Sequence, residues 1–453
     1  MKQRIFIIIL ALVGAALHLT AQVWQQQDPQ IPGPARVWLL QVPNETAAWV
    51  SGNEQDTFGF WTEENYIISR TTDGGQTWEN LSFPHTEPGY LSNICALNEN
   101  VAWISYVDYA NGNKILKTID GGQTWTDQPI GMAVWINFVH FFDNGVGLAM
   151  GDPDDQGFEI YVSQNGGNFW ERVDTADVPP ALPGEYGYSN YFEVSGSKVW
   201  FETSGERIYF SPNKGNTWQV FEGPLAGASY NMFAADDAGM CYMSYTEFDT
   251  NFLNPMIALY RTPDNGANWE DITPTDNTWN IWDIEPVPGA DAIIASFNKG
   301  IISGIYETRI SYDQGTTWLT IDAGTPVNFL AFSDDETGFG TGWQPLTDSS
   351  HPDVYSYSGS SLVGLFDRKP LNVNLSVSPN PTVDFVRLEL EAAQPDNFLL
   401  LLNDASGRLL QKQVFEKTDR WNTLLDLRTL PLGVYTVTVS TKEGVTVQKV
   451  MKQ

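Results

Sequence analysis

Cysteine and histidine are scarce in this chain, and their scarcity excludes several kinds of site. The 453 residues include two cysteines and four histidines. The histidines show no metal-ligand spacing and no serine-histidine-aspartate context, so we predict no metal site, no cofactor and no catalytic triad. Cys95 and Cys241 stand far apart, and we interpret both as small buried apolar residues rather than as a disulfide.

Long apolar runs are also missing, apart from one at the N-terminus. Residues 1–21 join Lys2 and Arg4 to the run IFIIILALVGAAL and then LTAQ, the pattern of a secretory signal peptide. No lipidation cysteine follows, and no later stretch approaches the roughly 20 apolar residues of a membrane span. We therefore expect a protein that is exported and has no membrane span.

Basic residues are few, because 24 Lys and Arg face 55 Asp and Glu, a formal net charge of −31 at pH 7. The leader holds two of the basic residues, and the last 83 residues hold nine of each sign. This leaves 13 basic and 46 acidic residues between them. Such a surface disfavours nucleic acids and other anionic polymers as partners, and it suits neutral glycans, cations or basic peptides.

An eight-residue segment recurs six times in the middle of the chain. The copies are TTDGGQTW (71–78), TIDGGQTW (118–125), SQNGGNFW (163–170), SPNKGNTW (211–218), TPDNGANW (262–269) and SYDQGTTW (311–318). Their Asp or Asn can accept hydrogen bonds from the amides of the turn, their second Gly position allows positive φ, and their Trp can pack between sheets. A period of 45 to 51 residues is typical of one four-stranded blade of a β-propeller.

These segments resemble Asp-boxes, the S/T-x-D-x-G-x-x-W repeats of sialidases, related glycosidases, sortilin-type receptors and photosystem II assembly-factor-type propellers. The resemblance implies that the boxes join the third and fourth strands of each blade, on the face opposite the substrate. We interpret the box aspartates as scaffold. A sialidase is disfavoured, since the comparable region near the start of the ring reads PARVW instead of the F/Y-R-I-P motif.

A seventh unit can be assembled from the two ends of the repeat region. Residues 37–52 match the inner strands of the other units, and residues 328–343 and 353–359 supply strands without a recognisable box. Pairing a strand at Trp24 with this last unit would close the ring and remove two exposed sheet edges. We therefore predict an all-β fold, with a seven-bladed propeller over residues 22–370.

The last 83 residues, 371–453, read as seven short alternating strands, which favours an immunoglobulin-like sandwich. The motifs SPNP (378–381), DASGRLL (404–410), LPLGVYTVTV (430–439) and the terminal KVMKQ resemble the C-terminal sorting domain of the type IX secretion system. This resemblance implies recognition by an outer-membrane translocon and a sortase. It also implies release from the cell or attachment to its surface. We expect a secreted or surface-displayed monomer.

Candidate site residues follow from the propeller topology, which places the loops opposite the boxes at one mouth of the ring. Aromatic and amide side chains there suit the binding of sugar rings. The alternative is that the amides satisfy strand ends and the aromatic rings belong to the core. The candidate binding residues are Trp38, Tyr90, Trp135, Tyr230, Trp279, Asn93, Asn137, Asn190, Asn231, Asn280 and Asn328.

Two functions from different classes remain open. The first, which we prefer, is a non-catalytic module that binds a glycan, a peptide or an envelope component of the cell. The second is a glycoside hydrolase acting on a neutral polysaccharide, with Asp152 and Glu202 on adjacent blades as the carboxylate pair. With 46 acidic residues in the ring, some pair near the channel is expected by chance.

Overall fold

The computed structural model divides the chain into two units, residues 1–362 and residues 363–453. It describes residues 23–31, 35–55, 61–83, 88–143, 145–225, 231–236, 238–248, 255–290, 292–299, 303–342, 353–359, 361–362, 371, 373–403, 409–441 and 445–453. The signal peptide predicted for residues 1–21 lies outside these ranges. Within them the secondary structure is 33 β-strands and one short 3-10 helix, η1 (Thr175–Asp177), and no helix is long and apolar enough to cross a membrane.

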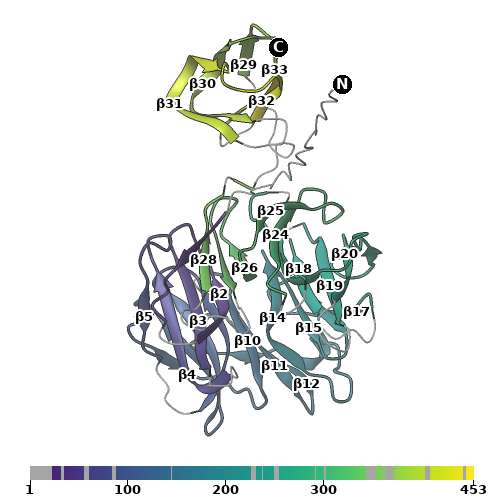
Figure 1. The fold of residues 1–453 in the computed structure, drawn as a ribbon. Coiled ribbons are helices and arrows are strands. Elements are labelled where there is room, and N and C mark those ends of the chain that lie inside the picture. Colours follow the sequence, from purple (N-terminus) through teal and green to yellow (C-terminus); the bar gives the residue numbers. More distant parts are fainter. Residues whose placement is uncertain are drawn as a thin grey trace, which may run out of the picture. The chain divides into compact units, whose positions relative to one another are not determined.

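The first unit is the predicted seven-bladed propeller, built from seven antiparallel sheets of four strands each (Figure 1). The innermost strands of blades 1 to 7 are β2 (Ala35–Gln41), β6 (Gly89–Ala96), β10 (Ile136–Phe141), β14 (Gly187–Ser195), β18 (Asn231–Ala235), β22 (Asn280–Pro286) and β26 (Val327–Phe332). Each of them contacts the innermost strand of the next blade, and β26 contacts β2, so the ring is closed.

In blades 1 to 6 the other strands follow outward in chain order, and in blade 7 the outer strand is β1 from the start of the propeller. The second strands are β3 (Ala48–Gln55), β7 (Ala102–Asp108), β11 (Gly147–Asp154), β15 (Lys198–Thr203), β19 (Cys241–Phe248), β23 (Ile293–Asn298) and β27 (Gly338–Gly342). The third strands are β4 (Trp61–Thr71), β8 (Gly112–Thr118), β12 (Gly157–Ser163), β16 (Arg207–Ser211), β20 (Pro255–Thr262), β24 (Tyr306–Ser311) and β28 (Asp353–Tyr357). The outer strands are β5 (Glu79–Leu81), β9 (Thr126–Gln128), β13 (Glu171–Arg172), β17 (Gln219–Glu222), β21 (Glu270–Asp271), β25 (Leu319–Ala323) and β1 (Trp24–Gln27).

The seventh blade is completed by the first strand of the chain, as predicted. Strand β1 pairs antiparallel with β28, with Trp24 opposite Tyr357. The Trp24 side chain is fully buried, and its Nε1 donates to Thr308 Oγ1 of blade 6 at 2.9 Å. Closure of this kind leaves no blade with a missing outer strand.

The six eight-residue segments form the turns between third and outer strands, and in each one the Asp or Asn at the third position accepts a backbone amide of the turn. In the first copy, Thr71 Oγ1 accepts the amide of Gly75 at 2.9 Å, and Asp73 Oδ1 accepts the amide of Thr77 at 2.8 Å. Glycine is required at the fifth position because φ is +90° at Gly75. The closing tryptophans pack between their own blade and the preceding one, as Trp78 does against Phe339 of blade 7.

The two faces of the ring are defined by which loops meet. The eight-residue turns contact the loops between first and second strands, since Gly121 N donates to Asn100 O and Gly166 N donates to Gly145 O. We call this side the turn face. The loops that enter the innermost strands meet those after the second strands on the other side, which we call the loop face. An example is the amide of Ser204, which donates to Tyr186 O.

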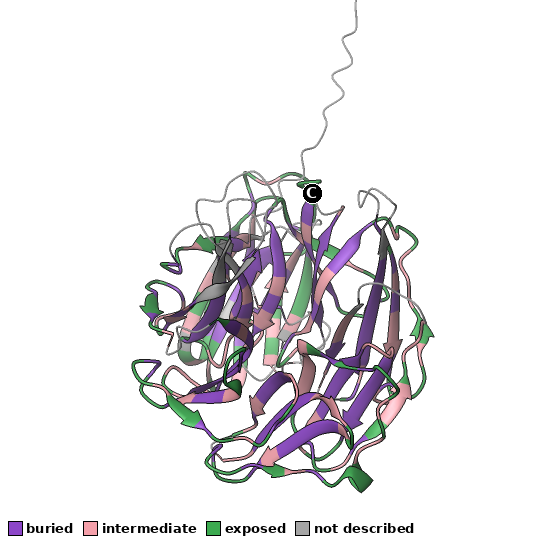
Figure 2. Ribbon diagram, turned by 90° about the horizontal axis from the view of Figure 1, so that it is seen from below, coloured by how far each residue is buried: buried purple, intermediate pink, exposed green. Residues whose placement is uncertain are grey.

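Burial follows the strands, and most exposed residues lie in the loops and in the outermost strands (Figure 2). Both cysteines are free and buried, as predicted. The largest fully buried side chains are mostly aromatic and include Trp24, Trp49, Trp103 and Trp200. Large rings fill the wedge-shaped gaps between blades, which explains why the propeller needs no disulfide.

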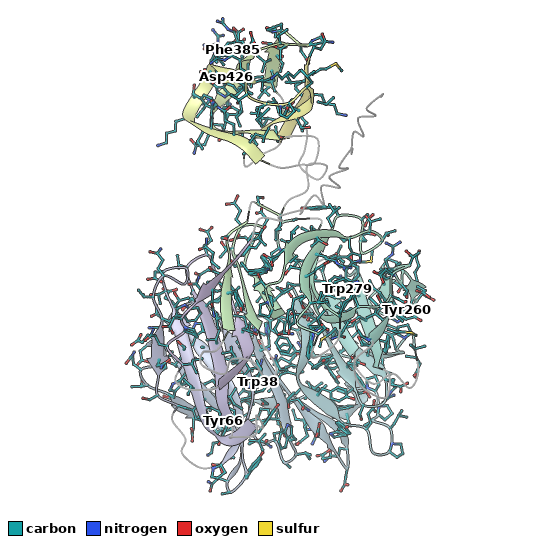
Figure 3. The ribbon with its side chains drawn as sticks, in the orientation of Figure 1. Trp38, Tyr66, Tyr260, Trp279, Phe385 and Asp426 are labelled. Carbon is teal, nitrogen blue, oxygen red and sulfur yellow. The ribbon has the colours of Figure 1, made fainter. Side chains whose placement is uncertain are left out.

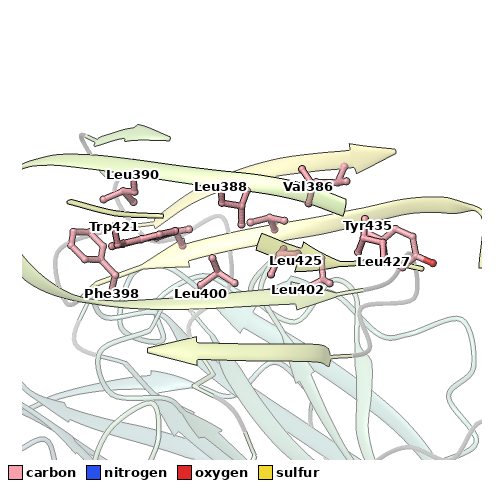
Figure 4. Packing of buried hydrophobic residues seen from close by; sticks show 13 residues of the cluster. Val386, Leu388, Leu390, Phe398, Leu400, Leu402, Trp421, Leu425, Leu427 and Tyr435 are labelled. Carbon is pink, nitrogen blue, oxygen red and sulfur yellow. The ribbon is translucent and has the colours of Figure 1, made fainter. Parts of the chain in front are cut away.

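The second unit is one strongly curled sheet with strands β29 (Val373–Ser378), β30 (Phe385–Asn403), β31 (Leu409–Asp426), β32 (Gly433–Ser440) and β33 (Val445–Lys452). The bridge between Thr382 and Lys452 nearly closes it into a small sandwich. Its core contains Leu388, Leu400 and Trp421 (Figure 4). Seven predicted strands became five, because β30 and β31 each continue through register shifts that we expected to be turns.

Candidate functional site

The innermost strands carry a bulge near the loop face, and this bulge decides which side chains reach the mouth. In blades 1, 2, 3, 4, 6 and 7 the register with the second strand shifts within the innermost strand. The shift is largest in β14, where Gly187 pairs with Thr203 but Phe192 pairs with Phe201. Inside this segment Asn190 adopts φ of +59°, a conformation that asparagine tolerates better than most residues.

The predicted asparagines do not form one ring of equivalent amides. Asn137 and Asn328 are the extra residues of their bulges, whereas Asn93 follows its bulge and Asn190 lies inside the long one. Asn280 comes before the bulge of blade 6. The side chain of Asn231 lies outside the described residues. These asparagines therefore hold different positions in their blades.

The side-chain amides of Asn93 and Asn190 link separate blades. Asn93 Oδ1 accepts the amide of Val139 in blade 3 at 3.0 Å, and Asn93 Nδ2 donates to Asn190 Oδ1 in blade 4 at 2.9 Å. Asn137 Nδ2 donates to Asp152 Oδ1 at 2.8 Å. Asn93 and Asn137 are buried. The geometry fits the structural alternative for these two residues, since Asn93 satisfies groups of neighbouring blades and Asn137 satisfies a carboxylate of its own blade.

Aromatic side chains form a continuous arc on the loop side of blades 1 to 3. The ring centroids of Trp38 and Tyr90 are 5.6 Å apart, and those of Tyr90 and Trp135 are 5.3 Å apart. Tyr109, in the loop after β7, reaches Trp135 at 6.4 Å and is 47% exposed. Trp38, Tyr90 and Trp135 are partly exposed. We call these four residues the aromatic arc.

Blade 4 extends this surface with Tyr186 and Tyr188, and sequence reasoning missed Tyr186. Trp135 Nε1 donates to Ser189 Oγ at 3.0 Å, which fixes the end of the arc against the long bulge. Tyr186 and Tyr188 contact each other with centroids 5.6 Å apart and are 49% and 36% exposed. Tyr186 lies just before the bulge of its blade, as Tyr90 and Trp135 do in theirs. The three positions are equivalent in the pairing of first and second strands, which the sequence alone does not reveal.

The opposite side of the mouth is different. Trp279 of blade 6 is 5% exposed, and its ring is covered by the guanidinium of Arg309, 4.2 Å from the ring centroid. Its Nε1 donates to Asp276 Oδ2 at 3.1 Å. Trp38 and Trp279 are labelled at their separate places in the ring in Figure 3. Tyr230 lies outside the described residues. Trp279 is therefore not part of the exposed aromatic surface of blades 1 to 4.

The acidic side chains beside the aromatic arc are bonded within the chain. Asp152 accepts from Asn137 Nδ2 and from the amide of Gly187 at 2.9 Å, and its burial raises its pKa. Two hydrogen bonds from Arg172, at 2.7 and 2.8 Å, lower the pKa of Asp154 to about 2. These carboxylates tie loops and blades together.

Two further carboxylates near the arc are also engaged. Glu159 Oε2 accepts the amides of Ala133 and Val134 at 2.8 and 2.7 Å. Glu185 is buried and accepts from Arg207 Nε at 3.0 Å. Glu202, the second residue of the predicted hydrolase pair, is 3% exposed on β15. In the described residues no group of three or more His, Cys, Asp and Glu side chains is arranged to hold a metal ion.

A second acidic group lines the innermost strands of blades 4 and 6. Asp283 accepts the amide of Leu330 in blade 7 at 2.7 Å, and burial raises its pKa to about 7. Burial and the neighbouring carboxylates raise the pKa of Glu285 well above its usual range. Burial and the charge of Asp283 do the same for Glu193. Sequence reasoning missed this cluster, because these residues become neighbours only through the register of β14 and β22.

Comparison with known proteins separates the two units. Residues 376–453 match the family described as the secretion system C-terminal sorting domain. No curated protein matches the chain. The structure titled YCF48 bound to D1 peptide is similar at 18% identity and a TM-score of 0.53, covering 75% of this chain and 98% of that one. YCF48 from Cyanidioschyzon merolae is similar at 15% identity and a TM-score of 0.51, covering 74% and 98%.

A third structure, the GH74 xyloglucanase from Xanthomonas campestris, has 12% identity and a TM-score of 0.45, covering 94% of this chain and 75% of that one. At 18% and 15% identity, the two YCF48 structures share a fold with the propeller and no more. The sorting domain indicates secretion by the type IX system to the cell surface or the extracellular space. The chain thus combines a seven-bladed β-propeller with a C-terminal segment that matches the family of secretion system sorting domains.

Proposed function

We propose that the protein is an exported, non-catalytic binding module that holds an extracellular ligand on the loop face of its propeller. One observation carries this proposal. Aromatic rings are exposed beside the mouth, whereas the carboxylates next to them are engaged as internal hydrogen-bond acceptors. A pair of carboxylates that act on a substrate must be able to reach it, which these contacts disfavour.

The export route completes the proposal. Residues 1–21 act as a signal peptide for passage into the periplasm, and residues 371–453 are recognised by the type IX translocon and an associated sortase. A propeller of the same fold, YCF48, has been solved with a D1 peptide bound, which fits a binding role for this architecture. After export the propeller is displayed on the surface or released.

The test is to measure retention and turnover together. The purified chain without residues 1–21 is incubated with a panel of insoluble and soluble polysaccharides and with peptides. Bound protein and released reducing ends are both quantified. We expect retention on at least one ligand without release of reducing ends. Release that disappears in Asp152→Asn or Glu202→Gln would replace this proposal with the glycoside hydrolase, whose general acid would have the raised pKa of Asp152.

A further inference from the structure

We propose that the aromatic arc of Trp38, Tyr90, Tyr109 and Trp135 is a binding site for an uncharged oligosaccharide. This inference rests on the proposed function and gives it a ligand class and a location. The arc runs over three consecutive blades, so it can hold several sugar units in a row. The channel and blades 5 to 7 would take no direct part.

The rings of the arc are held rigidly, which a stacking surface requires. Trp38 and Tyr90 meet at an interplanar angle of 36°, and Tyr90 and Trp135 at 42°. Neighbouring rings are therefore tilted against one another, and each also packs against the hydrophobic core of the blades. The indole of Trp135 is further fixed by its bond to Ser189 Oγ. Little conformational entropy remains to be lost when a ligand stacks on such rings.

The backbone anchors the same residues to neighbouring loops. The carbonyl of Trp135 accepts the amide of Asp152 at 2.8 Å, and the amide of Tyr109 donates to Pro88 O at 3.2 Å. The rings of Trp135 and Tyr109 thus start from hydrogen-bonded positions of the loop face. The 47% exposure of Tyr109 leaves one side of the arc open to solvent.

The charges of the propeller favour an uncharged ligand. The excess of acidic residues in the propeller repels an anionic ligand such as an acidic polysaccharide. A cationic ligand would need a carboxylate to pair with, but Asp154 next to the arc is paired with Arg172, and Asp152 is held by Asn137 and Gly187. A neutral molecule with apolar faces and many hydroxyl groups matches partly exposed rings in polar surroundings.

The experiment uses the full chain without residues 1–21 and isothermal titration with cellohexaose, xylohexaose and mannohexaose. Polygalacturonate serves as the anionic probe, and a hexalysine peptide as the cationic probe. We expect binding of at least one neutral hexasaccharide and none of the two charged probes. Tyr109→Ala should weaken that binding about threefold to tenfold, and Trp135→Ala at least about tenfold.

The matched control is Phe169→Ala, an aromatic residue that is 65% exposed in the turn of blade 3 on the turn face. It should leave affinity unchanged. Tyr109 is exposed, so its variant should unfold like the wild-type chain. Binding of a neutral hexasaccharide that survives both Tyr109→Ala and Trp135→Ala would overturn the location. Binding of only the peptide would overturn the ligand class and leave the proposed function standing. Cleavage of a hexasaccharide would overturn the proposed function itself.

Discussion

Replacement of Asp283 by Asn should make the propeller more stable at neutral and alkaline pH. Asp283 lies on β22 just after the bulge, and its carboxylate accepts the amides of Leu330 and Ile284 at 2.7 and 3.0 Å. Asn93 occupies the corresponding position in blade 2, where its Oδ1 accepts the amide of Val139 at 3.0 Å. An asparagine at position 283 can therefore keep the bond to Leu330 without the charge, and its single carbonyl oxygen gives up only the bond to the adjacent amide of Ile284.

The magnitude follows from the pKa of this group. Burial raises it from 3.8 to about 7, which corresponds to about 4 kcal/mol between the two protonation states. Two facts reduce this value: Asp283 is partly exposed, and its repulsion with Glu193 and Glu285 is spread over three carboxylates. We therefore expect Asp283→Asn to raise the free energy of unfolding by about 1 to 3 kcal/mol. Because the pKa of Asp283 is raised in the folded state, the wild-type chain loses stability as pH rises from about 4 to 7. The stability advantage of Asp283→Asn should therefore grow over this pH range.

Urea unfolding of the wild type, Asp283→Asn and the exposed control Asp155→Asn at pH 4.5 and pH 8 measures the effect. The first variant should exceed the wild type at pH 8 and approach it at pH 4.5, and the control should match the wild type at both. An Asp283→Asn chain no more stable than wild type at pH 8 would refute the reasoning. Its loss of stability at both pH values would show that the carboxylate is needed for packing.

Three further outcomes follow from single contacts. Gly215→Ala should cost about 2 to 3 kcal/mol in urea unfolding, because φ is +83° there and a Cβ would lie 2.5 Å from Leu148 Cδ1. Trp24→Ala should cost about 3 to 5 kcal/mol by the same measurement and increase proteolysis at blade 7, since it empties a fully buried site and removes the bond to Thr308. Lys452→Met should lower the amount of exported protein measured by cell fractionation. The buried Lys452 ammonium donates to the carbonyls of Leu427, Arg428 and Leu430, and these carbonyls would lose their donor in the sorting domain.

The fold was predictable because its signal is periodic. Each copy of the eight-residue segment carries its own turn chemistry, so six blades can be counted from the sequence, and Trp24 supplies the missing strand of the seventh. The strand count of the tail was not predictable, because Pro395 and Asn397 look like a turn but lie within the continuous strand β30. A register shift absorbs them instead of a chain reversal.

The candidate site was predictable only in part. The alternation of buried and exposed residues does not reveal where an extra residue enters a strand, so the asparagines seemed equivalent and Tyr186 was overlooked. Long-range contacts decide the rest. Trp279 looks like Trp135 in sequence, yet Arg309, 30 residues further on, covers its ring. The cluster of Glu193 and Asp283 depends on two strands from different blades.

The junction between the first strand and the last blade also sets the order of assembly. Residues 24–27 are synthesised before the other strands of the propeller but find their partner only when residues 354–357 are available, so β1 has no partner strand during most of synthesis. Joining such distant segments carries a large loop-closure cost, which makes the step slow relative to local hairpins. Until then β28 presents an unpaired edge to other chains, so the interval before closure is when intermolecular strand exchange competes with correct folding.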